Sequence, residues 1–133
     1  MSIICRSVSE LKSKTIFDEI QNEYNISFPH EMLEFFKKNN GGSPYKKEFM
    51  VDDIEYEVRC FLSFNGEDYN AIQKPLDSFQ KETKGKIVPV AKDSGDSYFC
   101  LNIENEKVYY WDKDENLYYK IADTFETFIN YLT

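Results

Sequence analysis

The sequence has little of what metal, disulfide or membrane proteins need. It contains one histidine, no CxxC pair and only three cysteines, which are at least 40 residues apart. This excludes a short-range zinc motif and predicts reduced thiols rather than a disulfide framework. The N-terminal MSIICRSV has only three consecutive apolar residues, far short of a signal peptide, and no later stretch is long enough to cross a membrane. We therefore expect a cytoplasmic protein with no cofactor and no membrane partner.

Positive charge is also scarce. Lys and Arg number 16 against 24 Asp and Glu, which gives a formal net charge of −8. Affinity for nucleic acid depends largely on Lys and Arg that neutralise phosphates, so this balance argues against a nucleic-acid partner. A basic protein would be attracted instead.

What the chain does contain is apolar and aromatic. Of its 133 residues, 41% are hydrophobic, and 11 are Phe and 10 Tyr. A chain of this length buries roughly two thirds of the surface that it exposes when unfolded. We expect residues 1–133 to form one folded domain, because no repeat, low-complexity tract or linker interrupts them.

Two helices are predicted near the N-terminus. Ser7 to Glu10 has the form of a capping box, and apolar residues from Leu11 to Tyr24 follow at helical spacing, so the first helix is expected there. Pro29 suits the first turn of a second helix, whose buried stripe is Met32, Leu33, Phe35 and Phe36. The glycines of NNGG come after this helix, whereas a phosphate loop precedes one. We interpret Gly41 or Gly42 as a left-handed helix end.

The rest of the chain has the pattern of strands and two more helices. Alternation from Tyr56 to Phe64 predicts a strand with one buried face. Tyr69 to Phe79 has helical spacing, although Pro75 delays or breaks that helix. Further strands are expected at 87–91, 98–103, 108–111 and 117–121, separated by turn residues, and Asp123 and Glu126 are in capping-box positions before a last helix. The fold class is α+β: an antiparallel sheet, or one with a mixed strand, with N-terminal helices and a C-terminal helix packed against it.

No catalytic constellation stands out. His30 is the only imidazole; a Cys–His pair could still be assembled in three dimensions, but a surface or capping role is favoured. Asp112, Asp114 and Asn116 match the start of a calcium loop, but Leu117 replaces the required glycine. We interpret that segment, and Asp93 to Asp96, as strand connections.

Four segments together resemble the SUKH superfamily, which includes fungal cell-wall-assembly regulators and many bacterial immunity proteins. They are PHEMLEFFKKNNGG, IVPVAKDSGDSYFCLNI, VYYWD and IADTFETFINYL, in that order between residues 26 and 132, with the N-terminal helix outside the strong match. Members often have Asp-His-Glu after the Trp, whereas this chain has Asp112, Lys113 and Asp114, so no role of that histidine carries over.

The resemblance implies a non-enzymatic domain that binds and blocks a cognate toxin, commonly a nuclease. The acidic composition suits a basic toxin domain. An adaptor in a cell-wall or signalling assembly is the alternative that the fungal relatives suggest, and a small hydrolase using His30 ranks last. Because turns and strand ends are accessible and Tyr and Trp are enriched at binding hot spots, the candidate contact residues are Asp93, Asp96, Tyr109, Trp111, Asp112, Asp114 and Glu115. The alternative for each is a plain surface or core position, and for the aromatic residues core packing and cross-strand pairing is the favoured interpretation.

Overall fold

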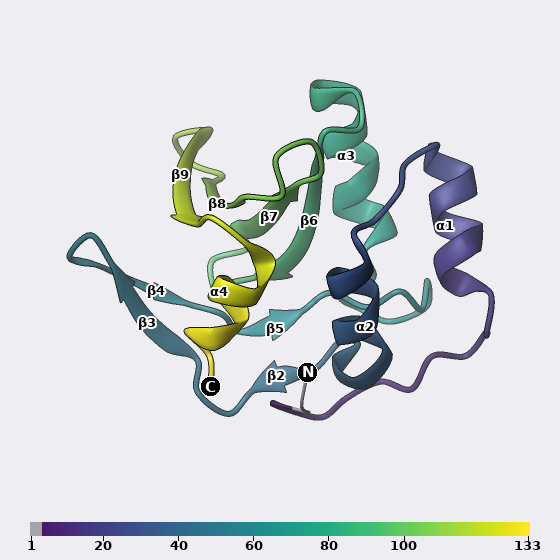
Figure 1. The fold of residues 1–133 in the computed structure, drawn as a ribbon, viewed down its shortest axis with the longest axis horizontal. Coiled ribbons are helices and arrows are strands. Elements are labelled where there is room, and N and C mark those ends of the chain that lie inside the picture. Colours follow the sequence, from purple (N-terminus) through teal and green to yellow (C-terminus); the bar gives the residue numbers. More distant parts are fainter. Residues whose placement is uncertain (1–3) are drawn as a thin grey trace.

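The computed structural model describes residues 4–133. Helices and strands follow one another in separate runs, which is the α+β arrangement expected from the sequence (Figure 1). In chain order they are β1 (Cys5–Arg6), α1 (Ile16–Tyr24), α2 (His30–Asn39), β2 (Ser43–Pro44), β3 (Glu48–Val51), β4 (Ile54–Glu57), β5 (Cys60–Phe61), α3 (Gln73–Thr83), β6 (Ile87–Lys92), β7 (Tyr98–Asn102), β8 (Val108–Asp112), β9 (Leu117–Ala122) and α4 (Phe125–Asn130).

A five-stranded antiparallel sheet of order β5-β6-β7-β8-β9 forms the centre of the fold. The predicted meander of four strands is confirmed as β6 to β9, and β5 adds an edge strand to it. Its only register shift between β6 and β7 lies between Pro89 and Ala91. A bulge is expected there, because proline has no N–H for the ladder.

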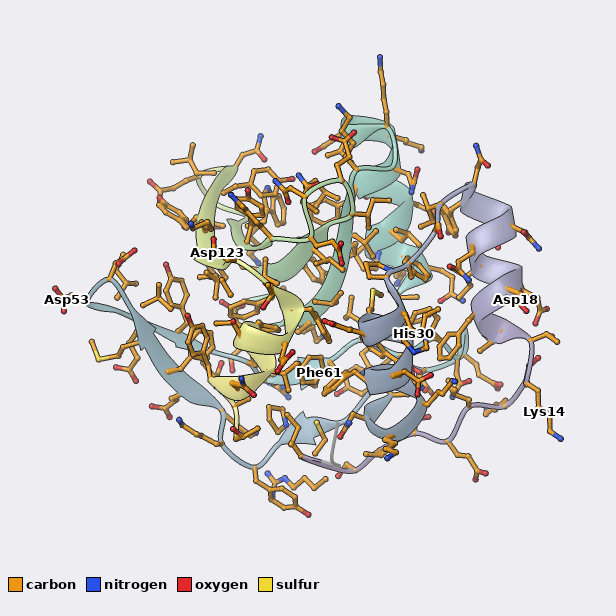
Figure 2. The ribbon with its side chains drawn as sticks, viewed as in Figure 1. Lys14, Asp18, His30, Asp53, Phe61 and Asp123 are labelled. Carbon is orange, nitrogen blue, oxygen red and sulfur yellow. The ribbon has the colours of Figure 1, made fainter. Side chains whose placement is uncertain are left out.

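Helices cover both faces of this sheet. On one face Phe128 of α4 stacks on Phe99 of β7 with ring centroids 5.4 Å apart, and Phe35 of α2 lies 5.5 Å from Phe125. On the other face Phe79 of α3 lies 5.3 Å from Trp111 of β8. The first face holds the larger core, and Figure 2 shows Phe61 inside it, between α2 and α4.

Helix α2 forms where the sequence predicts it, but its end differs. Pro29 directly precedes the helix. Met32, Phe35 and Phe36 of the predicted stripe are fully buried, whereas Leu33 is half-buried. Gly41 has φ +66°, and a Cβ there would lie 3.3 Å from that of Ser63. The helix ends at Asn39, and its C-cap Asn40 has φ −54° and ψ 124°, so the prediction that a left-handed glycine ends the helix is wrong. Gly41 instead supplies the positive φ of the following turn, in which the Gly42 N–H donates a 3.0 Å hydrogen bond to the Asn39 carbonyl, and it allows close packing against the segment after β5.

The predicted start of the first helix is wrong. Ser7 has φ 57° and follows β1, and α1 begins only at Ile16. The S-x-x-E match at Ser7 is coincidental. Glu19, in the first turn of the helix, instead accepts hydrogen bonds from the hydroxyls of Ser13 at 3.1 Å and Thr15 at 3.0 Å, which lie six and eight residues after Ser7.

The strand predicted from Tyr56 to Phe64 is divided. Tyr56 belongs to β4, which pairs with β3 in a separate hairpin that the sequence analysis missed, whereas β5 joins the main sheet. Every residue from Cys60 to Asn65 is buried, so this segment has no solvent face. Its period of two reflects packing on both sides rather than one buried face.

The remaining helix predictions are nearly correct. Helix α3 begins late, at Gln73, with Pro75 in its first turn as expected. Helix α4 is capped by Thr124, whose hydroxyl accepts the Thr127 N–H, rather than by Asp123. The difference is one residue, because Thr and Asp are both good caps.

Candidate functional site

Two acidic turns meet at one edge of the main sheet. The β6–β7 turn and the β8–β9 turn lie at the same end of the strands, because every second connection of an antiparallel meander is at that end. Tyr98 and Trp111 are paired in register, and the Lys113 N–H donates a hydrogen bond of 3.1 Å to the Ser97 hydroxyl. The fold therefore brings Asp93 and Asp112, which are far apart in sequence, to one surface.

The β3–β4 hairpin joins this edge at its base. The backbone N–H and the hydroxyl of Ser94 donate hydrogen bonds of 3.0 and 2.7 Å to Oε1 of Glu57. Figure 2 shows Asp53 at the far tip of the hairpin, pointing away from the body of the molecule. We call the resulting surface the acidic edge; its carboxylates are Glu57, Asp93, Asp96, Asp112, Asp114 and Glu115. They outnumber the cations beside them, which are Arg59, Lys92 and Lys113.

The carboxylates of the acidic edge differ in their hydrogen bonds and in their exposure to solvent. Asp93 Oδ1 accepts the N–H groups of Gly95 and Ser97, both at 2.9 Å, and Asp112 Oδ1 accepts that of Asp114 at 2.9 Å. Both side chains therefore hold their own turns, which confirms that these segments are strand connections. Asp96, Asp114 and Glu115 are exposed. Asp96 forms an ion pair of 3.7 Å with Lys92 Nζ.

Two predicted aromatic contacts lie on the other face of the sheet. Trp111 packs between Phe79 and Tyr98, and its indole N–H donates a 2.8 Å hydrogen bond to Asn116. Tyr109 is on the same face, edge-on to Tyr118. Both rings are half-buried. They are therefore separated by the sheet from the side chain of Asp112.

The face that carries Asp112 presents other tyrosines, which the sequence analysis did not select. Tyr110 and Asp112 share one face of β8, and Tyr110 is directly opposite Tyr119 of β9. Tyr56 of β4 approaches Tyr110 with ring centroids 5.2 Å apart. The parity of Tyr110 with Asp112 was visible in the sequence, but the hairpin that supplies Tyr56 was not predicted.

A known protein family matches most of the chain, including all but the last residue of the four segments that resemble the SUKH superfamily. The model of the SMI1/KNR4 family (SUKH-1) matches residues 13–131. The chain belongs to this family. The SUKH-1 match begins before α1, so the expectation that the N-terminal helix lies outside the match is wrong.

A curated relative extends the comparison. The SUKH-1 chain is 24% identical over 135 residues to the SPbeta prophage-derived uncharacterized protein YokK of Bacillus subtilis (strain 168). The alignment covers 84% of this chain and 69% of that protein. The resemblance seen in the sequence is thus confirmed at the level of the family.

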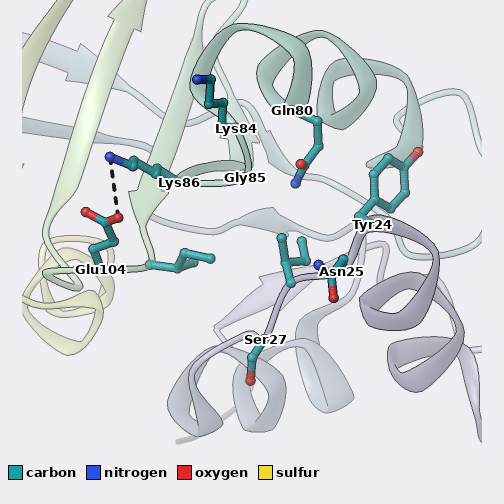
Figure 3. A pocket seen from close by; sticks show the side chains of 10 residues that line it. Tyr24, Asn25, Ser27, Gln80, Lys84, Gly85, Lys86 and Glu104 are labelled. Carbon is teal, nitrogen blue, oxygen red and sulfur yellow. Dashed lines mark ion pairs between the residues drawn. The ribbon is translucent and has the colours of Figure 1, made fainter.

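A hollow of this SUKH-1 fold lies away from the acidic edge, between the α1–α2 loop, the α3–β6 turn and the end of β7 (Figure 3). Its volume is about 640 Å³. Lys86 forms an ion pair of 3.5 Å with Glu104 at its rim, and Gln80 Nε2 is buried without a hydrogen-bond partner in the described part of the chain. Two of its three charged lining residues pair with each other, which leaves Lys84 as the remaining charge on a wide hollow, and this defines no particular ligand.

His30 and the thiols do not form a catalytic pair. The His30 side chain is 82% exposed at the start of α2, with Glu34 at 3.7 Å as its ionic neighbour. Cys5, Cys60 and Cys100 are all buried. None of the helices within residues 4–133 is long and apolar enough to cross a membrane.

Proposed function

We propose that this SUKH-1 domain is a cytoplasmic, non-enzymatic immunity protein that binds and neutralises a basic toxin, a nuclease domain in particular, through its acidic edge. The observation that carries the proposal is the convergence of three acidic segments, the β4 end and the two turns, on one edge of the sheet. Family membership supports it, because SUKH proteins include bacterial immunity proteins.

The physical reason is electrostatic complementarity. A domain that cuts nucleic acid needs a basic cleft to hold phosphates. Carboxylates gathered on one surface accelerate association with such a cleft and oppose binding of acidic proteins. The turns are internally hydrogen bonded, so little ordering is required when the partner binds. The negative charges are thus held on a preorganised surface.

Partner capture tests the proposal. The tagged protein is incubated with native lysate at about 50 mM and about 300 mM salt, and retained proteins are identified by mass spectrometry; screening at the higher salt weakens contacts between exposed charges. We expect one basic, toxin-like protein in stoichiometric amount, with less retained at the higher salt. Recovery of wall-synthesis or signalling proteins instead would favour an adaptor, and no specific partner would contradict the proposal.

Charge reversal locates the surface. Asp96, Asp114 and Glu115 are exposed, and within residues 4–133 their carboxylates accept no backbone hydrogen bond; Glu115 accepts only the Tyr119 hydroxyl, at 3.3 Å. Changing all three to Lys should therefore leave the fold intact. The control changes three other glutamates to Lys: Glu104 and Glu106 in the β7–β8 turn, at the opposite end of the sheet, and Glu31 of α2, which lines a hollow together with Glu106. Each variant loses three negative charges and gains three positive ones, which takes the net charge from −8 to −2. Only the first variant should lose the partner; equal loss in both would mean that the location of the charge is irrelevant.

A further inference from the structure

A small hollow lies beside the acidic edge, between the β3–β4 hairpin and the last two strands of the sheet. It has a volume of about 230 Å³ and is lined by Ile54, Tyr56, Tyr110, Asp112 and Tyr119. We call it the tyrosine pocket. Four of its five lining residues are apolar or aromatic, and the fifth is a carboxylate. A pocket with this lining suits a ligand that is apolar along its length and positive at one point.

The rings of the tyrosine pocket are held in place by the fold. Tyr56 and Tyr110 meet edge to face at an interplanar angle of 63°, and Tyr110 and Tyr119 are cross-strand partners. Behind them Phe99 lies 5.1 Å from Tyr110. The Tyr110 hydroxyl is tied to Asp93 by a hydrogen bond of 2.6 Å. The aromatic walls are therefore preorganised, which reduces the entropic cost of binding.

One carboxylate oxygen of Asp112 can still accept a hydrogen bond from a ligand. Its Oδ1 accepts the turn N–H groups of Asp114 and Glu115, but in residues 4–133 no hydrogen bond reaches its Oδ2. No lysine or arginine lines the pocket. Asp112 is half-buried and lines the pocket together with three tyrosines, and its Oδ2 is open to a cationic ligand.

The charge around the pocket is negative. Burial first, and then the nearby carboxylates of Asp93 and Asp112, raise the pKa of Tyr110 to about 12. Desolvation and the charges of Glu115 and Asp112 also raise the pKa of Tyr119. These carboxylates disfavour an anionic ligand and attract a cation.

We propose that the tyrosine pocket binds an arginine side chain of the basic partner, with its methylene stem against Ile54 and its guanidinium between the tyrosine rings and Asp112. The guanidinium is planar and delocalised, stacks on aromatic faces and can also donate to a carboxylate. The ammonium of lysine is more strongly hydrated and cannot stack. A purely apolar side chain would cover Asp112 without pairing it, which is unfavourable.

This inference rests on the proposed function for the identity of the partner, but its test does not. The probe is the capped peptide Ac-Gly-Arg-Gly-NH2, titrated into the ¹⁵N- and ¹³C-labelled protein and followed by NMR. Its controls are the same peptide with lysine and with citrulline, which keeps the shape of arginine without the charge. We expect weak binding of the arginine peptide, with Kd on the order of millimolar, and upfield shifts of its δ-methylene protons from the tyrosine rings.

Two variants and a control assign the site. Tyr119→Leu removes one half-buried wall, and Asp112→Asn removes the charge but keeps an oxygen for the turn. Each should weaken arginine binding by about five- to tenfold, the size of a cation–π or ionic contact. Tyr118→Leu changes the neighbouring ring on the opposite face of β9 and should have no effect. Circular dichroism establishes that all three variants are folded.

Several results would overturn the inference. They are the absence of binding, equal binding of the citrulline peptide, equal or tighter binding of the lysine peptide, and unchanged binding in Tyr119→Leu. If the arginine peptide binds as expected but no toxin is captured, the pocket stands and the proposed function fails. If a toxin is captured but its binding is unaffected by Tyr119→Leu, the function stands and the pocket is not its anchor.

Discussion

The Tyr110 hydroxyl donates a hydrogen bond of 2.6 Å to Oδ2 of Asp93. The other oxygen of the same carboxylate accepts the N–H groups of Gly95 and Ser97 in the β6–β7 turn. One side chain therefore fixes both the conformation of an acidic turn and the position of a ring in the tyrosine pocket.

Removing this hydroxyl should destabilise the protein without removing the ring. For Tyr110→Phe we expect the free energy of unfolding to fall by about 1 to 2 kcal/mol, because a hydrogen bond to a charged acceptor is lost. Urea unfolding at pH 7 measures it. Tyr118→Phe is the control, since the Tyr118 hydroxyl has no hydrogen-bond partner within the described residues. Equal midpoints for Tyr110→Phe and wild type would show that the bond contributes nothing.

Like charges face each other on the outer side of the hairpin. Glu48 is directly opposite Glu57, and a hydrogen bond shared with Glu55, followed by the charges of Glu55 and Glu57, raises the pKa of Glu48. A raised pKa in the folded state stabilises the protein below the ordinary value of 4.5, and this contribution is lost as the pH rises through the folded pKa. Repulsion therefore destabilises the hairpin at neutral pH.

Neutralising one of these carboxylates should raise stability. Glu55→Gln is expected to unfold at a higher urea concentration than wild type at pH 7, with a difference that shrinks as the pH falls below the ordinary value of 4.5. Glu106→Gln, in the turn between β7 and β8, is the control. A lower midpoint at pH 7, or a difference independent of pH, would contradict this account.

Asp68 joins the N-terminal segment to the loop after β5. Its Oδ2 accepts hydrogen bonds from the hydroxyls of Ser63 at 2.6 Å and Ser9 at 2.7 Å, and the bond from Ser63 is the main cause of its lowered pKa. A lowered pKa stabilises the fold above the ordinary value of 3.8, and the contribution is lost as the pH falls through the folded pKa.

Asp68→Asn should therefore destabilise the protein at pH 7 by about 1 to 2 kcal/mol, because two hydrogen bonds lose their charged acceptor. The difference from wild type should diminish in acid. Thermal unfolding at several pH values between 2 and 7 measures both effects. Asp114→Asn, at an exposed turn position, should change little. An acid profile of Asp68→Asn that parallels wild type would remove Asp68 as the cause.

The buried thiols should be unreactive. Burial raises the pKa of Cys5 to about 12 and that of Cys100 well above 9.0, so both remain protonated at neutral pH, and the thiolate is the reactive form. We expect no thiol to react with a disulfide reagent at pH 8 before the protein unfolds, and all three to react in urea. Stability should fall between pH 9 and 12, because only the unfolded chain then releases these protons. Rapid reaction of the native protein would contradict the burial.

The sequence predicts the parts of the fold that depend on local patterns. Strands β6 to β9 are short β-rich runs separated by turn residues, and α2 has a proline at its start and a glycine after its end. The hairpin was missed because its turn is Asp52-Asp53, with φ of 52° and 64°, instead of the more typical Asn-Gly. Its strands are also only four residues long, which is too short to establish a period.

The acidic edge was predicted in part and the tyrosine pocket was not. Asp96, Asp114 and Glu115 could be chosen because turns are exposed whatever the tertiary structure. The pocket combines Tyr56 with Tyr110 and Tyr119, which are distant in sequence and meet only because the missed hairpin folds across the end of the sheet. Trp111 was selected as a contact residue because Trp is common in binding sites. The alternation of side chains along β8 places its ring on the face of the sheet that α3 covers.

Protection of growing cells tests the central claim most directly. The basic protein captured on the wild-type chain is expressed from an inducible promoter together with wild type, with the variant in which Asp96, Asp114 and Glu115 are Lys, or with the control carrying Lys at positions 31, 104 and 106. The account predicts that the captured protein arrests growth and that wild type and the control restore it, while the acidic-edge variant, expressed at an equal level, does not. A captured protein that is harmless, or full protection by the acidic-edge variant, would contradict it.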